Sequence, residues 1–315
     1  MRMRSSDFEL FLLRSARRKL LDHVEVIEGE FLPLAKAVVR AQVFKRPGAG
    51  SQTVVIVPDP PNLIEHHAQV IEALSKDYRV VCFELPGFGF SHPSAGFQFT
   101  VEEQTAAMIE VFEKLRVRDA ILEMACLGAF VGLNVAQQRP DLIRKLVLLQ
   151  LPSYREAQDW AKRADLMNII GTPWLGQMFM HLGHTAVARR WYKAALPPGG
   201  ARQVHRDYLP LTLEGFDRGA CFCLASAYQT LHSQPTRRRV HLSQEAVVIW
   251  GTADPSHVAT DRRSILELIP NARLVEFPGC GHFPSLEATE RYLSILRAED
   301  ASVNARQSYR AALVS

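Results

Sequence analysis

The chain has 315 residues, of which 47% are hydrophobic and 22% charged, as in an ordinary globular protein with a sizeable core. Its formal net charge of +4 is small and its basic residues are scattered, so a nucleic-acid partner is not expected. Five cysteines, an odd number at low density, favour reduced thiols and a cytoplasmic location over a disulfide framework. No apolar run reaches the roughly 18 residues of a transmembrane helix.

The first 30 residues contain a predicted amphipathic helix at 8–24. Phe8, Phe11, Leu12 and Leu20 recur near helical spacing, with basic residues between them. A basic amphipathic helix can lie on a membrane surface. We favour the alternative, in which its apolar face packs on the protein's own surface.

Short apolar runs then alternate with helical patterns. Strands are predicted at 37–44, 53–57, 79–84, 119–124, 145–150, 246–250 and 274–277. Helices are predicted at 64–75, 101–115, 127–138 and 289–297. This alternation predicts an α/β fold with a mainly parallel sheet flanked by helices.

The pattern changes between the fifth and sixth of these strands. Residues 152–241 are helical, aromatic and punctuated by Pro and Gly, which predicts a helical cap inserted over the carboxyl edge of the sheet. The core is then formed by residues 31–151 and 242–298, and residues 299–315 form a polar, frayed tail. Large apolar pockets are often lined by aromatic side chains. The candidates here are Trp174, Phe179, Trp191, Tyr192 and Phe283.

Cys126 is the first candidate for a reactive group. It lies between a predicted strand and a predicted helix, with Gly128 two positions later, a pattern typical of a nucleophile held on a tight turn. The position two residues earlier, where a second glycine is usual, is Met124. A buried structural cysteine is the alternative for this segment alone.

Two later segments favour the catalytic interpretation. Asp254 follows the predicted strand 246–250, and His282 lies in a Gly-rich loop after the next strand. A carboxylate can orient an imidazole, and the imidazole can then accept the proton of a nucleophile. The chain order of nucleophile, acid and histidine fits a strand–turn–helix nucleophile on a parallel sheet. We therefore predict Cys126, His282 and Asp254 as the catalytic residues.

These motifs resemble the α/β-hydrolase superfamily, in its capped branch of esterases, C–C hydrolases, haloalkane dehalogenases and epoxide hydrolases. The resemblance covers roughly residues 37–297. It includes a loop at 83–91 that is similar to D-x-P-G-x-G-x-S, with Glu84 in place of Asp. The resemblance implies the α/β-hydrolase fold and a Cys-His-Asp triad in place of Ser-His-Asp.

The loop that supplies oxyanion donors in this family also departs from its pattern. The family's H-G-x-P aligns with Pro58-Asp59-Pro60-Pro61. The residue at x normally donates its backbone N–H, which Pro60 lacks. The second donor of the family, the amide of the residue after the nucleophile, corresponds to Leu127. Loss of one such donor costs about 10²–10³-fold in rate where it has been measured.

Three functions are compatible with this site. A cysteine nucleophile favours hydrolysis or transfer of the acyl group of a thioester or activated ester or lactone, because a thiolate leaves more readily than an alkoxide. The first alternative is a non-hydrolytic enzyme, catalysing proton transfer, elimination or cyclisation in the same pocket. The second is a small-molecule-binding protein on a degenerate scaffold. The expected partner is a small, largely apolar molecule, and the motifs indicate no organic cofactor and no metal.

Overall fold

The computed structural model describes residues 3–20, 27–48, 50–199, 204–235 and 239–297. A central sheet has the strand order β1-β2-β4-β3-β7-β8-β10-β11, and β6 pairs with β2. Pairing is antiparallel between β1, β2 and β4 and parallel from β4 to β11. The predicted mainly parallel sheet is confirmed. Its strands are β1 (Glu30–Pro33), β2 (Ala37–Phe44), β3 (Thr53–Val57), β4 (Arg79–Phe83), β6 (His92–Pro93), β7 (Ala120–Ala125), β8 (Ile143–Leu149), β10 (Glu245–Gly251) and β11 (Arg273–Phe277).

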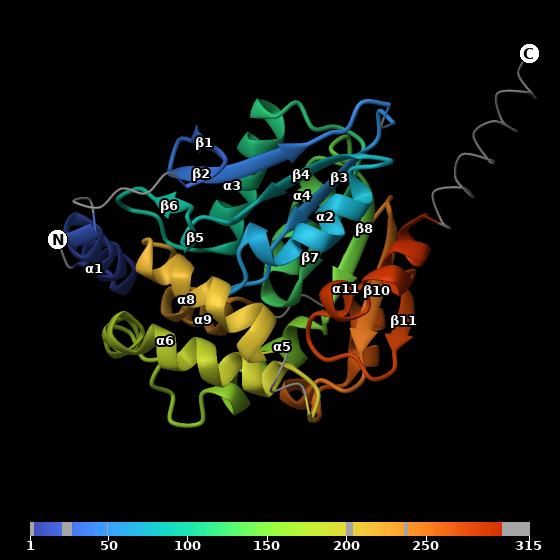
Figure 1. Ribbon diagram of the computed structural model, residues 1–315. Helices are drawn as coiled ribbons and strands as arrows, with labels where there is room; N and C mark the ends of the chain where they lie inside the picture. Colours follow the sequence, from blue (N-terminus) through green and yellow to red (C-terminus); the bar gives the residue numbers. More distant parts are fainter. Residues whose placement is uncertain (1–2, 21–26, 49, 200–203, 236–238, 298–315) are drawn as a thin grey trace, which may run out of the picture.

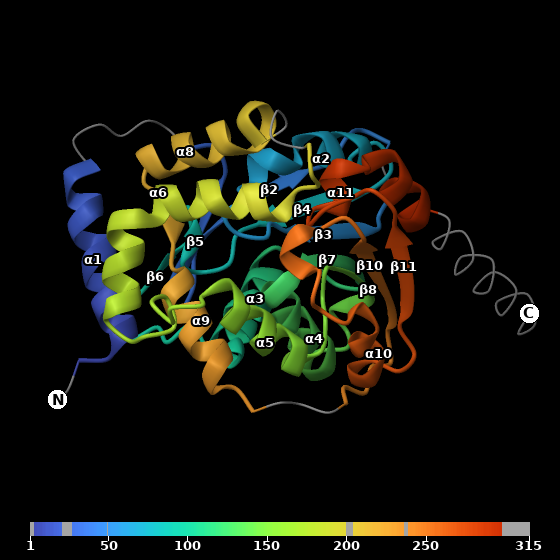
Figure 2. The same ribbon diagram turned by 90° about the horizontal axis from the view of Figure 1, so that it is seen from below.

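Helices cover both faces of this sheet (Figures 1 and 2). Figure 2 shows α2 and α11 above the sheet and α3, α4 and α10 below it. Burial on both faces explains why β3, β7 and β8 are nearly continuous apolar runs without polar alternation. The helices are α2 (Ala68–Leu74, extending the short helix Ile64–His67), α3 (Val101–Lys114), α4 (Ala129–Gln138), α10 (Ile265–Leu268) and α11 (Pro284–Glu287); residues 289–297 are also helical.

A helical region is inserted between β8 and β10, which are neighbours in the sheet. It contains α5 (Tyr154–Ala164), α6 (Leu175–Ala195), a π-helical turn (Val204–Tyr208), α8 (Leu209–Asp217) and α9 (Leu224–Ser233). The sequence pattern did not predict the short strand β9 (Cys221–Phe222) of this region, which pairs with β5 (Phe88–Gly89) outside the insertion. This pairing ties the inserted region to the loop at 83–91.

The amino-terminal helix α1 (Ser5–Leu20) packs against the inserted region, at one end of the molecule (Figures 1 and 2). Leu10 is buried with Phe97 and Cys223, and the Glu9 carboxylate accepts the backbone N–H of Ser226 at 3.1 Å. Leu10 therefore packs within the protein, whereas Phe11 of the predicted apolar face is 61% exposed. Residues 21–24 of the predicted helix and the predicted tail at 299–315 lie outside the described residues. None of the helices in the described ranges combines the length and apolar character needed to span a bilayer.

The loop at 83–91 is held by a buried ion pair. Glu84 accepts hydrogen bonds from Arg40 of β2 at 2.7 and 3.2 Å, and from the backbone N–H of Phe90 at 2.7 Å. Gly89 has φ +52, and a Cβ there would collide with the Glu84 carboxyl group. Glycine is therefore required at 89, because the backbone passes directly over the charged pair.

Candidate active site

Cys126 occupies the turn between β7 and α4, where it begins the short 3-10 helix Cys126–Gly128. Its φ is +50, a strained value for a residue with a Cβ, and its side chain is buried. Met124 takes the position where a glycine was expected. A Cβ on Gly132 of α4 would lie 2.9 Å from the Met124 sulfur. The absence of a side chain at Gly132 therefore leaves room for the side chain of Met124.

His282 and Asp254 lie together beside this turn. The Nδ1 atom of His282 is 2.7 Å from Oδ2 of Asp254, and both side chains are buried. Asp254 accepts three further hydrogen bonds, from the N–H of Ser256 at 2.9 Å, its hydroxyl at 2.7 Å and Nε2 of Gln150 at 2.8 Å. Burial disfavours the charged carboxylate, but the charge and hydrogen bond of His282 outweigh it and hold the pKa of Asp254 below its usual value. The imidazole is therefore held in one orientation by a fixed carboxylate.

Asp59 brings a second carboxylate to the same imidazole. Its Oδ2 lies 3.3 Å from Nε2 of His282, although the contact lacks hydrogen-bond geometry and Nε2 has no such partner among the described residues. Burial favours the neutral ring, but Asp254, Asp59 and Cys126 together raise the pKa of His282 well above its usual value. Burial and then the charge of Asp59 raise the pKa of the Cys126 thiol, while His282 and the backbone amide of Leu127 lower it. The arrangement favours an imidazolium between two carboxylates over a free thiolate.

The loop that carries Asp59 offers no backbone donor at Pro60, whereas the amide of Leu127 lowers the pKa of the Cys126 thiol. A different donor lies nearby. The indole Nε1 of Trp191 is buried, and it has no hydrogen-bond partner in the part of the chain that the structure describes. The Trp191 ring meets the His282 ring edge-on, with centroids 4.8 Å apart. Sequence reasoning placed Trp191 among the pocket aromatics but did not identify this N–H.

His257 is the residue of the site that sequence reasoning missed. It lies three positions after Asp254 on the short helix Pro255–His257, and its ring is buried next to that of His282, with centroids 5.2 Å apart. Burial lowers its pKa to about 3, so the ring is neutral. The available sequence signal was the D-P-x-H spacing, because a one-turn helix after Asp254 returns the third residue toward the acid.

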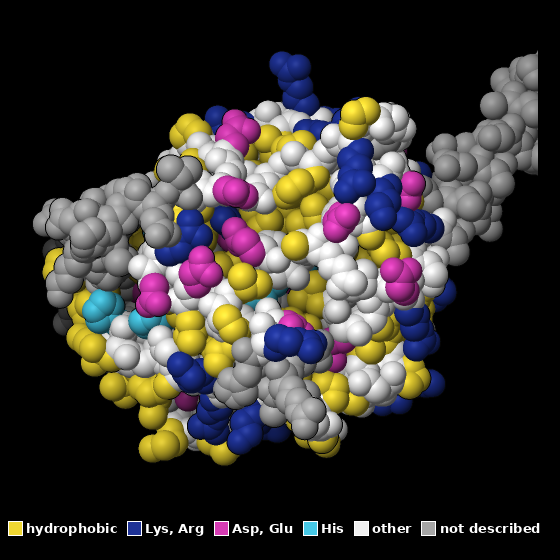
Figure 3. Space-filling view, in the orientation of Figure 1, with side chains coloured by type: hydrophobic (Ala, Val, Ile, Leu, Met, Phe, Trp, Pro, Cys, Tyr) yellow, Lys and Arg dark blue, Asp and Glu magenta, His cyan; other side chains and the backbone are white. Residues whose placement is uncertain are grey.

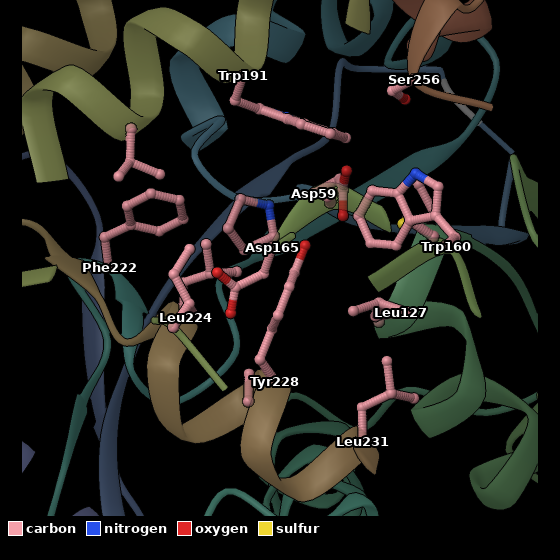
Figure 4. Close-up of a pocket in the computed structure, with 18 of the residues that line it drawn as sticks. Asp59, Leu127, Trp160, Asp165, Trp191, Phe222, Leu224, Tyr228, Leu231 and Ser256 are labelled. Atoms are coloured by element: carbon pink, nitrogen blue, oxygen red, sulfur yellow. The ribbon is translucent and has the colours of Figure 1, made fainter. Parts of the chain in front are cut away.

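A cavity of about 740 Å³ is lined by Cys126, Asp59 and mainly apolar side chains. Figure 4 shows Trp160 of α5, Trp191 of α6 and Tyr228 of α9 directed into it from the inserted helices. Of the predicted pocket aromatics, Trp191 and Phe179 line the cavity. The others lie elsewhere: Trp174 contacts Phe8 of α1, while Tyr192 and Phe283 are packed in a buried cluster with Tyr208.

A comparison with protein families identifies the family of the chain that carries this site. Residues 54–295 match the model of the alpha/beta hydrolase family. The chain belongs to that family. It is 32% identical over 123 residues to an uncharacterized hydrolase, YugF, of Bacillus subtilis, an alignment that covers 39% of this chain and 43% of the relative.

Two longer matches cover most of the chain. It is 24% identical to a 2-hydroxymuconate semialdehyde hydrolase of Pseudomonas putida, over 74% of this chain and 81% of the relative. Among solved structures, an enol-lactonase from Burkholderia xenovorans superimposes with a TM-score of 0.63 at 17% identity, covering 83% of this chain and 96% of the other. At this identity the superposition shows the fold, and the reaction has to be argued from the site.

Proposed function

We propose that this hydrolase-family protein cleaves, or transfers, the acyl group of a thioester or an activated ester or lactone, with Cys126 as nucleophile. The observation that carries the proposal is the placement of the thiol. It lies on a positive-φ turn at the base of the cavity, beside a histidine that a buried carboxylate orients. In the first step the neutral form of His282 accepts the proton of the Cys126 S–H at Nε2, and the sulfur attacks the carbonyl carbon.

The second half of the reaction uses the same groups in reverse. As the tetrahedral adduct collapses, the bond to the leaving group breaks and His282 returns the proton to the departing sulfur or oxygen. Water, deprotonated by His282, then attacks the acyl-Cys126, and the thiol is regenerated. Asp254 and Asp59 both favour the imidazolium that forms in each half, which supports His282 as the proton carrier.

The leaving group determines which substrates suit a cysteine. An adduct of Cys126 with an ordinary alkyl ester expels the thiolate, because the alkoxide is the poorer leaving group, and the ester re-forms. A thioester, an aryl ester or an enol lactone leaves at least as readily as the cysteine does. The structural neighbour from Burkholderia is named an enol-lactonase, and an enol lactone belongs to this class of activated substrates.

The developing oxyanion needs donors, which Pro60 cannot supply. We assign the Leu127 amide as one donor. The indole N–H of Trp191 is assigned as the second donor, in place of the backbone N–H that Pro60 lacks. Trp191 comes from the inserted helix α6 and lines the cavity with its N–H buried and unpaired among the described residues. An unsatisfied buried donor is costly in the free protein and gains its partner only when a substrate carbonyl is present.

The cavity wall indicates an apolar acyl or ring moiety. Leu166, Met167 and Val258 line the cavity and are also 80–85% exposed, which places them at its opening. Apolar side chains gather over α6 at the lower left edge of the surface in Figure 3. Burial of matching substrate surface stabilises binding by about 25 cal/mol per Å².

Intact-protein mass spectrometry tests the proposal. Wild-type protein is mixed with a panel of acyl thioesters, aryl esters and enol lactones, beside the variants C126A and C280A. Cys280 is a matched control because it is a buried cysteine close to His282 in the chain. We expect an acyl adduct or turnover with wild type and C280A and neither with C126A. Turnover by C126A at the wild-type rate, or no adduct and no turnover with any member of the panel, would refute the proposal.

One observation favours a second candidate, a proton-transfer or lyase activity that needs no acyl intermediate. The Asp59 carboxylate lies 3.3 Å from Nε2 of His282, so it places a second acid–base group beside the nitrogen that would take the thiol proton. In that case Asp59 and His282 exchange a proton with the substrate, and C126A retains most activity while H282A loses it. Thermal stabilisation by a ligand without any turnover would instead indicate a binding protein.

A further inference from the structure

The Cys126 sulfur and one ring nitrogen each of His257 and His282 all lie within 4.8 Å of one another. All three side chains are at least nine-tenths buried. The Nε2 atoms of both histidines have no hydrogen-bond partner in the described part of the chain. The triad needs only one imidazole beside the thiol, so the second buried ring is unexplained by the proposed acyl chemistry.

Each imidazole is held from its far side. Nδ1 of His282 lies 2.7 Å from Asp254, and Nδ1 of His257 lies 3.1 Å from the Thr260 hydroxyl, so each Nδ1 atom has an oxygen that is able to accept its proton. Nε2 of the neutral His257 ring then carries a lone pair, and Nε2 of His282 carries one once that ring has lost its second proton. Trp160 also stacks on His257, with ring planes 5° apart, and fixes its plane. Metal-binding histidines are typically oriented by such an outer oxygen on the other ring nitrogen.

We infer that Cys126, His257 and His282 form a binding site for Zn²⁺. One thiolate and two imidazoles are a donor set that zinc binds readily, and three protein ligands leave a fourth position for water or substrate. Two imidazoles on one tetrahedral zinc, with Zn–N bonds of about 2.0–2.1 Å, have ring centres about 5 Å apart. The observed separation between the rings of His257 and His282 is 5.2 Å.

Binding is balanced by loss of protons: the Cys126 S–H becomes a thiolate bound to the metal, and the imidazolium of His282 gives up its Nε2 proton. The carboxylate of Asp59, 3.3 Å from Nε2 of His282, adds negative charge on the side of the cavity. Zinc occupies the sulfur and the Nε2 lone pair that the proposed hydrolysis uses. We therefore expect the zinc form to lack acyl-transfer activity; this consequence rests on the proposed function, whereas the binding itself does not.

Cobalt titration of chelator-treated protein tests the site by absorbance, without any substrate. We expect one equivalent of Co²⁺ to bind with a thiolate-to-cobalt charge-transfer band, and Zn²⁺ to displace it. C126S should lose the band while preserving the size of the side chain. H257Q should weaken binding by about 100-fold or more, since even outer-shell partners are worth 10–100-fold.

H184Q is the matched control, because His181 and His184 form an i, i+3 pair on α6 that could bind metal adventitiously. It should leave both the band and the affinity unchanged. Absence of the band in wild type, its persistence in C126S, or equal affinities of H257Q and wild type would each overturn the inference. Thioester turnover is measured separately on the chelator-treated protein. Activity there without cobalt binding disproves the metal site alone, and cobalt binding without activity disproves only the hydrolase proposal.

Discussion

The substitution D254N examines how the carboxylate controls His282. Oδ1 of Asp254 accepts two hydrogen bonds, from the N–H and the hydroxyl of Ser256. An asparagine oxygen is expected to remain there, which turns its NH₂ group toward the Oδ2 position. The NH₂ group, which is itself a donor, would then face two other donors, Nε2 of Gln150 and Nδ1–H of His282.

This contact between donors is relieved by a change of tautomer at His282. Gln150 cannot reverse its amide, because its Oε1 accepts the backbone N–H of Gly251 at 2.7 Å. His282 is left to move its proton to Nε2, so that Nδ1 accepts from the asparagine. Nε2 then cannot take the proton of Cys126. The same substitution in a Ser-His-Asp protease lowers kcat about 10⁴-fold, which corresponds to about 5 kcal/mol on the barrier.

The assay is release of thiol from the best thioester of the panel, with single-turnover acylation followed by mass spectrometry. D261N is the control, because Asp261 caps the following 3-10 helix through the same kind of hydrogen bond, to the N–H of Arg263 at 2.9 Å. We expect D261N to keep wild-type rates. A folded D254N protein with kcat within tenfold of wild type would refute the orienting role of Asp254.

Three further predictions concern the donors, the thiol and the loop at 83–91. W191F is expected to lower kcat by about 10²–10³-fold with little change in KM, and an unchanged kcat would exclude the indole as an oxyanion donor. Because burial and the charge of Asp59 raise the pKa of Cys126, its alkylation by iodoacetamide should accelerate as the pH rises beyond the usual thiol range. D59N should lower that pKa and move the acceleration to lower pH; identical pH profiles would contradict this. G89A should reduce the free energy of unfolding by about 3–5 kcal/mol because it disrupts the buried ion pair. G48A, with φ +85 and open space around the new Cβ, should cost only about 1–2 kcal/mol, and equal losses in urea denaturation would show that backbone strain alone is responsible.

Much of the fold was predictable because its signals are local. The strands at 37–44 and 53–57 were predicted with the bounds that the structure has, since β-branched runs between turn residues are strong strand signals. The helix start at 101 was also predicted, and the Thr100 side chain caps it by accepting the N–H of Glu103 at 3.1 Å. Short pairings were missed, such as β5 with β9, because two residues carry no periodicity and their partners are far apart in the chain.

By itself the sequence determined the type of sheet, the turn that carries Cys126, and the order in which the acid and the histidine follow it. These features depend on residue type and spacing within one strand and its adjoining loop. Tertiary structure alone decided what surrounds them. Asp59, His257 and Trp191 reach His282 from three separate segments, and their distances from its ring depend on how the sheet edge, the short helix after Asp254 and α6 pack together. Contacts of this kind leave no periodic pattern in the sequence. They are the reason that the predicted triad lies beside a second carboxylate, a second imidazole and an indole N–H that has no partner among the described residues.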